Sequence, residues 1–360
     1  MFKPAFQITP PLTGVLMDIE ASRQAVTDLP IGIHVLASLR ESARLLSTHY
    51  STRIEGNRLT QEQVEDVLRG GTFPNRRRDE REVRNYYQAL DYLDGLIKTS
   101  SPRITEPDIQ TLHGLVMEGT ARFLPYRDGQ NVIRDSSNNA IVYMPPEAKD
   151  VPVLMQNFIA WLNDETDKAE LPVPIIAAIA HYQYATIHPY YDGNGRTARL
   201  LASLVLHKSG YGLKGIYALE EYYARDLPAY YKALTAGESH NYYLGRAEAD
   251  ITHWIAYFCE GMANAFANIR AKASDAAKRN TTDHSLLLRE LNQRQKQVLS
   301  LFRHSKFVTT REMAVLLHIQ QRTVLNQCKK WTEEGFLVQR GSANKSRKYE
   351  LAPKWLELLS

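Results

Sequence analysis

The sequence has few of the features that mark secreted or membrane proteins. Only two cysteines occur in 360 residues, Cys259 and Cys328, and their spacing fits neither a disulfide framework nor a cysteine-based zinc site. No apolar run reaches the roughly 18 residues that a membrane-spanning helix needs. The N-terminus lacks the ordered regions of a secretory signal. We therefore expect a cytoplasmic protein that does not enter a membrane.

Charge is unevenly distributed along the chain, although its net value is only +4. Residues 293–360 contain 13 Lys and Arg against 5 Asp and Glu, whereas the remaining residues contain 31 against 35. Positive charge confined to one end is typical of a segment that binds a polyanion. The run Arg76–Glu82 instead mixes both signs at helical spacing, and we expect it to be a solvated surface.

Glycine and proline are sparse inside long segments whose apolar residues recur every three or four positions, which predicts a mainly α fold. Two short strand-like runs, 130–134 and 140–143, predict one β-hairpin among the helices. A polar, weakly patterned stretch near 272–282 suggests a linker. The predicted helices are 14–27, 32–53, 60–68, 81–98, 105 onward, 151–164, 173–187, 194–208, 217–225, 228–237 and 247–272.

The segment from His188 to Arg199, His-Pro-Tyr-Tyr-Asp-Gly-Asn-Gly-Arg-Thr-Ala-Arg, concentrates groups that bind phosphate. Gly193 and Gly195 allow backbone N–H groups to approach an anion at the start of a helix. Asn194 adds a side-chain amide. Arg196 and Arg199, three positions apart on one helix face, suit a polyphosphate better than a monoanion.

Two further residues complete the chemistry of this segment. Asp192 is its one carboxylate and therefore the candidate ligand for Mg²⁺. His188 titrates near neutral pH and can accept a proton from a hydroxyl nucleophile. A base, a metal carboxylate, an anion nest and two arginines are typical of phosphoryl or nucleotidyl transfer.

The segment resembles the Fic signature, His-Pro-Phe-x-[Asp/Glu]-Gly-Asn-Gly-Arg followed by Arg three residues on, with Tyr190 in place of Phe. The resemblance covers roughly residues 80–270. It implies a Fic helical bundle that transfers AMP from ATP, with Mg²⁺, to a Tyr, Ser or Thr hydroxyl of a protein. It also implies that the hairpin at 130–143 is a flap that aligns the target. The residue roles implied are His188 as base, Asp192 as metal ligand, and Gly193, Asn194, Gly195, Arg196, Arg199, Tyr230 and Tyr231 as ATP-binding residues.

A second pattern suggests regulation. Ser51-Thr-Arg-Ile-Glu55-Gly56 resembles the inhibitory motif [Ser/Thr]-x-x-x-Glu-[Gly/Asn] of Fic proteins with an N-terminal inhibitory helix, known as class II. The resemblance pairs Glu55 with Arg199, which would deprive the γ-phosphate of its arginine. Alternatively, Glu55 is a surface residue at a helix end, or it positions water for removal of AMP.

Residues 289–360 look like a winged helix-turn-helix, with three amphipathic helices before a strand–loop–strand. The candidate DNA contacts are Gln321, Arg322, Thr323, Asn326 and Arg347. A protein-docking or dimerisation module is the alternative. The predicted organisation is an N-terminal helical region with the inhibitory helix at 1–80, a Fic core at 81–272, a linker at 273–288 and the winged helix at 289–360.

These features predict a self-inhibited AMP transferase that modifies a protein target, itself included. Two other functions remain open. In one, the Fic fold only senses nucleotide within a DNA-binding transcriptional regulator. In the other, the enzyme uses a different nucleotide donor or removes AMP. A homodimer that controls the inhibition is also compatible with the sequence.

Overall fold

The structure is a computed structural model that describes residues 2–29, 31–99, 103–134, 139–279, 287, 290–303, 305–317, 319–341, 347–356 and 358. The chain divides into two compact units, Met1–Lys278 and Arg279–Ser360. Within the described ranges, no helix combines the length and the apolar character needed to cross a bilayer.

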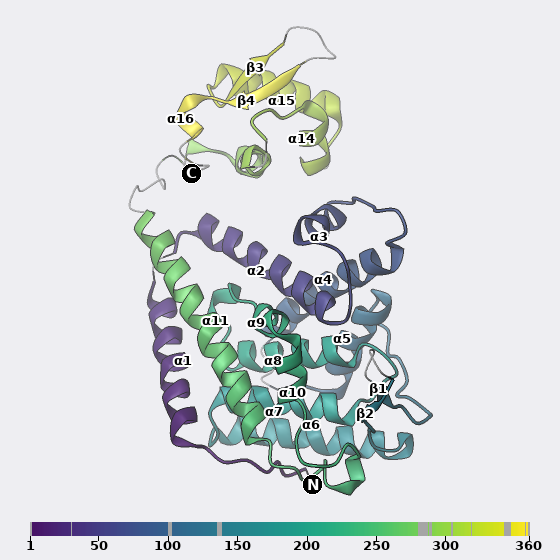
Figure 1. The fold of residues 1–360 in the computed structure, drawn as a ribbon. Helices are drawn as coiled ribbons and strands as arrows, with labels where there is room; N and C mark the ends of the chain where they lie inside the picture. Colours follow the sequence, from purple (N-terminus) through teal and green to yellow (C-terminus); the bar gives the residue numbers. More distant parts are fainter. Residues whose placement is uncertain are drawn as a thin grey trace. The chain divides into compact units, whose positions relative to one another are not determined.

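The first unit is built almost entirely from helices (Figure 1). Its α-helices are α1 (Pro10–Asp28), α2 (Ile33–Ile54), α3 (Gln61–Leu68), α4 (Arg77–Ile97), α5 (Glu106–Glu118), α6 (Val151–Lys168), α7 (Val173–Ile187), α8 (Asn194–Lys208), α9 (Glu220–Arg225), α10 (Leu227–Ala233) and α11 (Thr252–Arg279). Three short 3₁₀ turns join some of them: η1 (Ala148–Asp150), η2 (Leu213–Gly215) and η3 (Tyr242–Leu244).

Helix α7 forms the centre of this unit. Nearly all its residues from Pro174 to Ile187 are buried, as expected for a helix that is apolar on every face. It packs against α6 and α8, while α4 and α5 cover another side of α8 and α2 lies against α4 and α9. The loop from α7 to α8, which contains the candidate motif, is therefore held between two buried helices.

Local sequence signals set several helix ends. A capping box of Thr60 and Gln63 begins α3, and Thr105 caps α5 in the same way. Helix α2 ends beside Gly56, which has a φ of 92° that other residues rarely adopt. Glu55 is the C-cap residue of that helix.

Several helix boundaries differ from the sequence prediction. Helix α4 begins at Arg77 instead of residue 81, since Asp79 and Glu80 in its first turn favour a helix N-terminus. The run Arg76–Glu82 thus forms the start of α4, and the expectation of a solvated surface is wrong for Glu80 and Glu82, which are buried.

Helix α11 continues to Arg279, into the segment expected to be a linker from residue 273. Ala273 is buried in the core, which explains why the helix extends that far. Of the rest of the expected linker, residues 280–286 and 288 lie outside the described residues.

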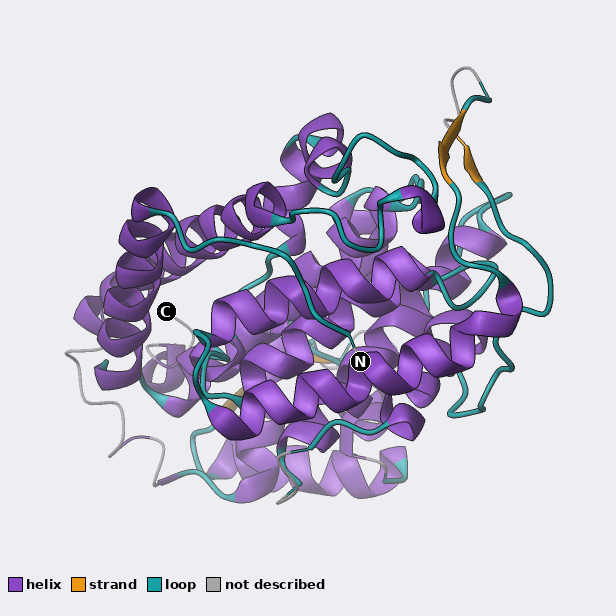
Figure 2. Cartoon of the chain, turned by 90° about the horizontal axis from the view of Figure 1, so that it is seen from below, coloured by secondary structure: helices purple, strands orange, loops and turns teal. Residues whose placement is uncertain are grey.

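The predicted β-hairpin is present but shorter than expected. Strand β1 (Ile133–Arg134) pairs antiparallel with β2 (Ile141–Tyr143), with Ile133 opposite Tyr143 and a register irregularity beside it. Residues 135–138 of its expected loop lie outside the described residues. Figure 2 shows the hairpin projecting from the helical body of the first unit.

The second unit has its own apolar core, formed mainly by Val298, Val324, Trp331, Phe336 and Tyr349. Its helices are followed by two antiparallel strands in which Leu337 lies opposite Leu351. The elements are α13 (Gln293–Leu299), η4 (Ser300–Arg303), α14 (Thr310–Leu317), α15 (Gln321–Glu333), β3 (Leu337–Arg340), β4 (Lys348–Leu351) and α16 (Pro353–Leu356).

Candidate active site

The candidate motif forms a sharp connection between α7 and α8. His188 caps the C-terminus of α7 in the left-handed conformation, with a φ of 51°, and its N–H donates to Tyr184 O at 3.0 Å. Pro189 follows, which disfavours continuation of the helix. Gly193, with a φ of 78°, then precedes α8 as its N-cap. The left-handed backbone conformations of His188 and Gly193 turn the chain from the end of α7 to the start of α8.

The His188 imidazole is oriented as a base requires. Its Nδ1 lies 3.2 Å from Ala185 O, which can only accept a hydrogen bond, so we assign the proton to Nδ1 and a lone pair to Nε2. Desolvation lowers the pKa of His188 to about 4, although the bond to Ala185 opposes this shift. The ring is therefore neutral at physiological pH and can accept a proton through Nε2.

The N-terminus of α8 is already in contact with a carboxylate. A β-carbon on Gly195 would collide with Glu55 Oε1, so the absence of a side chain at Gly195 makes this contact possible. Helix N-termini bind anions through their unpaired N–H groups and their dipole. Glu55 of α2 thus lies where the sequence predicted that phosphate would bind.

The Arg199 guanidinium is buried and is held by Ser51 and Glu55. Its Nε donates to Ser51 Oγ at 2.9 Å, and its Nη2 donates to Ser51 O at 2.9 Å and to Glu55 Oε1 at 2.8 Å. The Arg199 side chain is 1% exposed and that of Glu55 is 30% exposed. Burial alone would lower the pKa of Arg199, but the charge of Glu55 raises it above its ordinary value.

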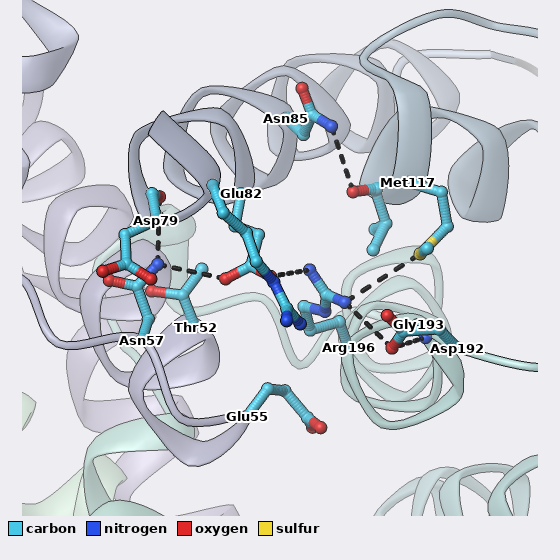
Figure 3. Close-up of polar contacts among 12 residues, drawn as sticks. Thr52, Glu55, Asn57, Asp79, Glu82, Asn85, Met117, Asp192, Gly193 and Arg196 are labelled. Carbon is cyan, nitrogen blue, oxygen red and sulfur yellow. Dashed lines mark hydrogen bonds and ion pairs between the residues drawn. The ribbon is translucent and has the colours of Figure 1, made fainter. Parts of the chain in front are cut away.

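Arg196 contacts other partners than Arg199 does, although the sequence predicts that the two side chains lie on one helix face. Its Nη2 lies 3.3 Å from Asp192 Oδ1, and its Nη1 lies 4.0 Å from Glu82 Oε1 on α4. Figure 3 shows this guanidinium between the side chains of Glu82 and Asp192. The two arginines of the motif are therefore held by separate helices, α2 and α4.

Asp192 is the predicted metal ligand. Its side chain is 53% exposed, and its Oδ1 accepts from Gly193 N at 2.6 Å and from Arg196. Among the described residues, no group of three or more His, Cys, Asp or Glu side chains is arranged to hold a metal. One accessible carboxylate fits a Mg²⁺ ion that arrives with a nucleotide, since that ion takes most of its ligands from phosphate and water.

Comparison with known proteins identifies this region. Residues 103–206 match the model of the Fic/DOC family. The chain contains a Fic domain. Protein adenylyltransferase Fic of Drosophila willistoni is 31% identical over 198 residues, which are 54% of this chain and 38% of that protein. The Drosophila virilis protein is 30% identical over 54% of this chain and 39% of its own. The chain thus spans less than half the length of these curated relatives.

Solved Fic structures share the fold. A Fic family protein from Desulfovibrio desulfuricans G20 superposes with a TM-score of 0.60 and 22% identity, covering 98% of this chain and 99% of that one. Fic-1 from C. elegans has a TM-score of 0.57 and 24% identity, covering 74% and 72%. The predicted mainly α Fic fold is confirmed by these likenesses and by the helices described above.

Behind the Fic motif, Tyr190 stacks on His113 with ring centroids 3.5 Å apart. Tyr190, which replaces the Phe of the signature, is buried as its position predicts, yet its hydroxyl has no hydrogen-bond partner among the described residues. His113 also approaches Thr197 Oγ1 at 3.2 Å, and desolvation lowers its pKa to about 3. The motif loop therefore rests on an apolar, uncharged support.

The two tyrosines predicted to lie near adenine have different environments. Tyr230 is buried, with its hydroxyl 3.1 Å from His181 Nε2 and 3.5 Å from Arg199 Nη1. Tyr231 is half-exposed, and its hydroxyl donates to Ile54 O at 3.2 Å, at the end of α2. Tyr230 thus lies behind Arg199, whereas Tyr231 faces the surface beside Glu55.

Sequence reasoning missed Arg127, which joins the flap to the Fic motif. Its buried guanidinium donates to His188 O at 2.9 Å, to Gly129 O at 3.0 Å and to Pro146 O. Its backbone N–H donates to Pro189 O at 3.0 Å. A single arginine in a Tyr-Arg-Asp-Gly turn gives no local sign of these contacts, because His188, Pro189 and Pro146 come from other segments and only Gly129 belongs to the turn itself.

The predicted DNA contacts belong to the second unit. Gln321, Arg322, Thr323 and Asn326 are exposed along the first half of α15, opposite a buried stripe of Val324, Cys328 and Trp331. Arg347 precedes β4 and is partly exposed. The expected loop between the two strands, 342–346, lies outside the described residues.

Proposed function

We propose that this protein is a self-inhibited protein adenylyltransferase that transfers AMP from ATP to a Tyr, Ser or Thr hydroxyl of a protein, itself included. The Drosophila relatives bear the name protein adenylyltransferase Fic. Because the chain covers less than half of their length, similarity supports the reaction class and leaves the target protein open. The Fic motif provides a base and a phosphate site within one loop.

In the proposed reaction, each residue of the motif has a separate task. The N–H groups at the start of α8 and the two arginines bind the phosphates and neutralise their charge. His188 Nε2 accepts the proton of the target hydroxyl as its oxygen attacks the α-phosphorus. The bond from that phosphorus to the bridging oxygen breaks, and pyrophosphate leaves with the electron pair. Mg²⁺ bound with the substrate and held by Asp192 would stabilise the charge on the leaving group.

The flap has a positioning task in this reaction. Ile141 and Val142 of β2 are both substantially exposed on the projecting hairpin. An extended segment of a target protein can pair with such an edge through backbone hydrogen bonds, which would carry its hydroxyl to His188. Arg127 would hold the flap in register with His188, since its guanidinium contacts the carbonyl of His188 and those of Gly129 and Pro146, which flank the flap.

Self-inhibition rests on a single observation, the position of the Glu55 carboxylate against both Arg199 and Gly195. Two unit charges about 4 Å apart attract by roughly 4 kcal/mol at an effective dielectric of 20, before desolvation and solvent screening are subtracted. The ion pair occupies the arginine that would bind the γ-phosphate. ATP would then bind in a geometry that does not favour transfer.

The experiment uses labelled ATP with Mg²⁺ and compares wild type, Glu55→Gly and Glu55→Gly/His188→Ala. We expect weak self-labelling by wild type, strong labelling by the single variant and none by the double variant. Glu41→Gln, which removes an exposed carboxylate from the same helix, is the control and should label like wild type. Labelling that is equal in wild type and Glu55→Gly would contradict self-inhibition, and labelling by the double variant would contradict the role of His188.

We further propose that the second unit is a winged helix-turn-helix that binds DNA. Support comes from the exposed polar half of α15, from the strand pair that follows it and from the charge surplus of residues 293–360. Binding to duplex DNA should weaken steeply as salt rises, because phosphate contacts release counterions. Absence of binding at low salt would favour the protein-docking alternative.

A further inference from the structure

Glu82 is a buried carboxylate in a run of charged residues that otherwise looks like a surface. It is 8% exposed on α4, and buried carboxylates are rare unless they are paired. Glu80, two residues earlier, is 4% exposed, but its partners are local to α4 and the preceding loop: it accepts from Phe73 N and from Arg84 Nη2. Glu82, in contrast, contacts two distant segments: the motif, through Arg196, and the turn after α2, through Asn57.

The two oxygens of Glu82 face different parts of the site. Oε1 accepts from Arg78 Nε at 2.9 Å and lies 4.0 Å from Arg196 Nη1. Oε2 accepts from Asn57 Nδ2 at 3.2 Å. In Figure 3, Glu82 accordingly lies between Asn57 and Arg196. One carboxylate thus bridges a phosphate-binding arginine and the turn that follows α2.

Asn57 anchors that turn through its side-chain amide and its backbone N–H. Its Nδ2 also donates to Asp79 O at 2.9 Å, and its Oδ1 accepts from Leu59 N at 3.1 Å. Its backbone N–H donates to Thr52 O at 3.1 Å, one turn before Glu55. Asn57 is 6% exposed, so these bonds are shielded from water. The end of α2 is therefore anchored to α4 independently of the Glu55–Arg199 ion pair.

We propose that Glu82 is a positioning residue that aims Arg196 at the phosphates, and that the Asn57–Glu82 bond is a second anchor that keeps Glu55 on Arg199. This inference rests on the proposed function. The carboxylate of Glu82 fixes Arg196 from the side away from the substrate. Its amide partner restrains the turn that carries Glu55. The two motif arginines are thereby coupled to the same helix end, Arg199 directly and Arg196 through Glu82.

The role of Glu82 is tested in the Glu55→Gly background, where Arg199 is released. Glu82→Gln retains the volume and a hydrogen-bond acceptor for Asn57 but loses the charge that orients Arg196. We expect kcat for self-labelling to fall about tenfold, with KM for ATP changed much less, since small misplacements act mainly on the transition state. Glu82→Asp should recover part of the loss.

Glu80→Gln in the same background is the matched control, because Glu80 is equally buried on α4 and does not contact the motif. Its kcat should stay within about twofold of the parent value. Equal kcat for Glu82→Gln and the Glu55→Gly parent would overturn the positioning role. So would an equal fall in kcat for Glu82→Gln and Glu80→Gln, because the effect would then come from general loss of packing in α4.

The anchor is tested with Glu55 intact. Asn57→Ala should raise wild-type self-labelling several-fold but less than Glu55→Gly, and the double variant should label no more than Glu55→Gly. Amide hydrogen exchange of residues 52–59 should also accelerate in Asn57→Ala, which needs no activity to observe. Unchanged labelling and unchanged exchange in Asn57→Ala would overturn the anchor. If Glu55→Gly itself fails to label, the proposed function fails, and the exchange measurement still decides the anchor.

Discussion

Glu55 and Arg199 are 144 positions apart in the sequence, yet Glu55 Oε1 lies 2.8 Å from Arg199 Nη2. The contact joins the end of α2 to α8 and closes over Gly195, where a nucleotide phosphate would otherwise bind. Ser51, one turn before Glu55, contributes two more acceptors to the same guanidinium. Ser51 and Glu55 therefore contact Arg199 together from one face of the end of α2.

Ser51→Ala should weaken self-inhibition without abolishing it. The change removes the acceptor of Arg199 Nε, a buried bond to a charged group worth about 1.5–3 kcal/mol, but keeps the Ser51 carbonyl and Glu55. Self-labelling should rise to a level between wild type and Glu55→Gly. Ser42→Ala, an exposed serine on the same helix, is the control. Labelling at the wild-type level would show that Glu55 alone holds Arg199.

The rate of self-labelling by Glu55→Gly should vary little between pH 8 and pH 6. His188 has a pKa lowered to about 4 by desolvation, so it remains an unprotonated base across this range. With an ordinary pKa near 6.5, the neutral fraction would fall about fourfold over the same interval. Initial rates at saturating ATP and Mg²⁺ measure this directly. A midpoint near pH 6.5 would contradict the buried environment of His188.

Stability should fall on acidification, because desolvation keeps several histidines neutral in the folded chain. Desolvation lowers the pKa of His113 and His181 to about 3 and that of His188 and His207 to about 4. Below pH 6.5 the unfolded chain binds protons that the folded chain excludes, so the unfolding free energy decreases as pH falls toward 4. Each histidine contributes a slope of up to about 1.4 kcal/mol per pH unit.

Urea unfolding at pH 7 and pH 5 measures this dependence, and a His207→Leu variant isolates one contribution. The variant should lose less stability than wild type between the two pH values. An identical pH dependence in both proteins would mean that His207 is as easily protonated in the folded state as in the unfolded state.

Arg127→Met should reduce both stability and activity. The change leaves the carbonyls of His188, Gly129 and Pro146 without their donor in a buried position, at a cost of about 1–3 kcal/mol for each group left unpaired. In the Glu55→Gly background, self-labelling should fall at least tenfold because the flap and His188 lose their common support. Arg122→Met, an exposed neighbour, should change neither thermal unfolding nor labelling.

Local signals in the sequence predicted most of the helices and the motif loop. Thr60 and Thr105 carry capping patterns that act over three residues, and Gly56 stops α2 through its own backbone preference. The Glu55–Arg199 pairing came from resemblance to a family motif, since nothing in either local segment specifies the other. The contact itself is present in the structure, while its inhibitory role stays a prediction.

The remaining features depend on distant partners. Glu82 and Arg127 look like ordinary charged residues in the sequence, because most of their partners lie on other segments. These partners are Asn57 and Arg196 for Glu82, and the carbonyls of His188 and Pro146 for Arg127. Nothing in the sequence around Tyr230 indicates that its hydroxyl would lie beside Arg199. The flap strands are shorter than their apolar pattern suggested, since pairing requires a partner strand in register as well as a suitable sequence.

The position of Glu55 as the C-cap of α2 has an electrostatic consequence. A carboxylate is disfavoured at the negative end of its own helix dipole and favoured at the positive end of another, so Glu55 is stabilised chiefly by the start of α8. A polyphosphate that binds there repels both the carboxylate and the α2 terminus. Under the proposed function, nucleotide and the end of α2 would compete for one helix end, and by linkage each would weaken the other by the same factor. The energy needed to release the inhibitory helix would then come from the substrate itself.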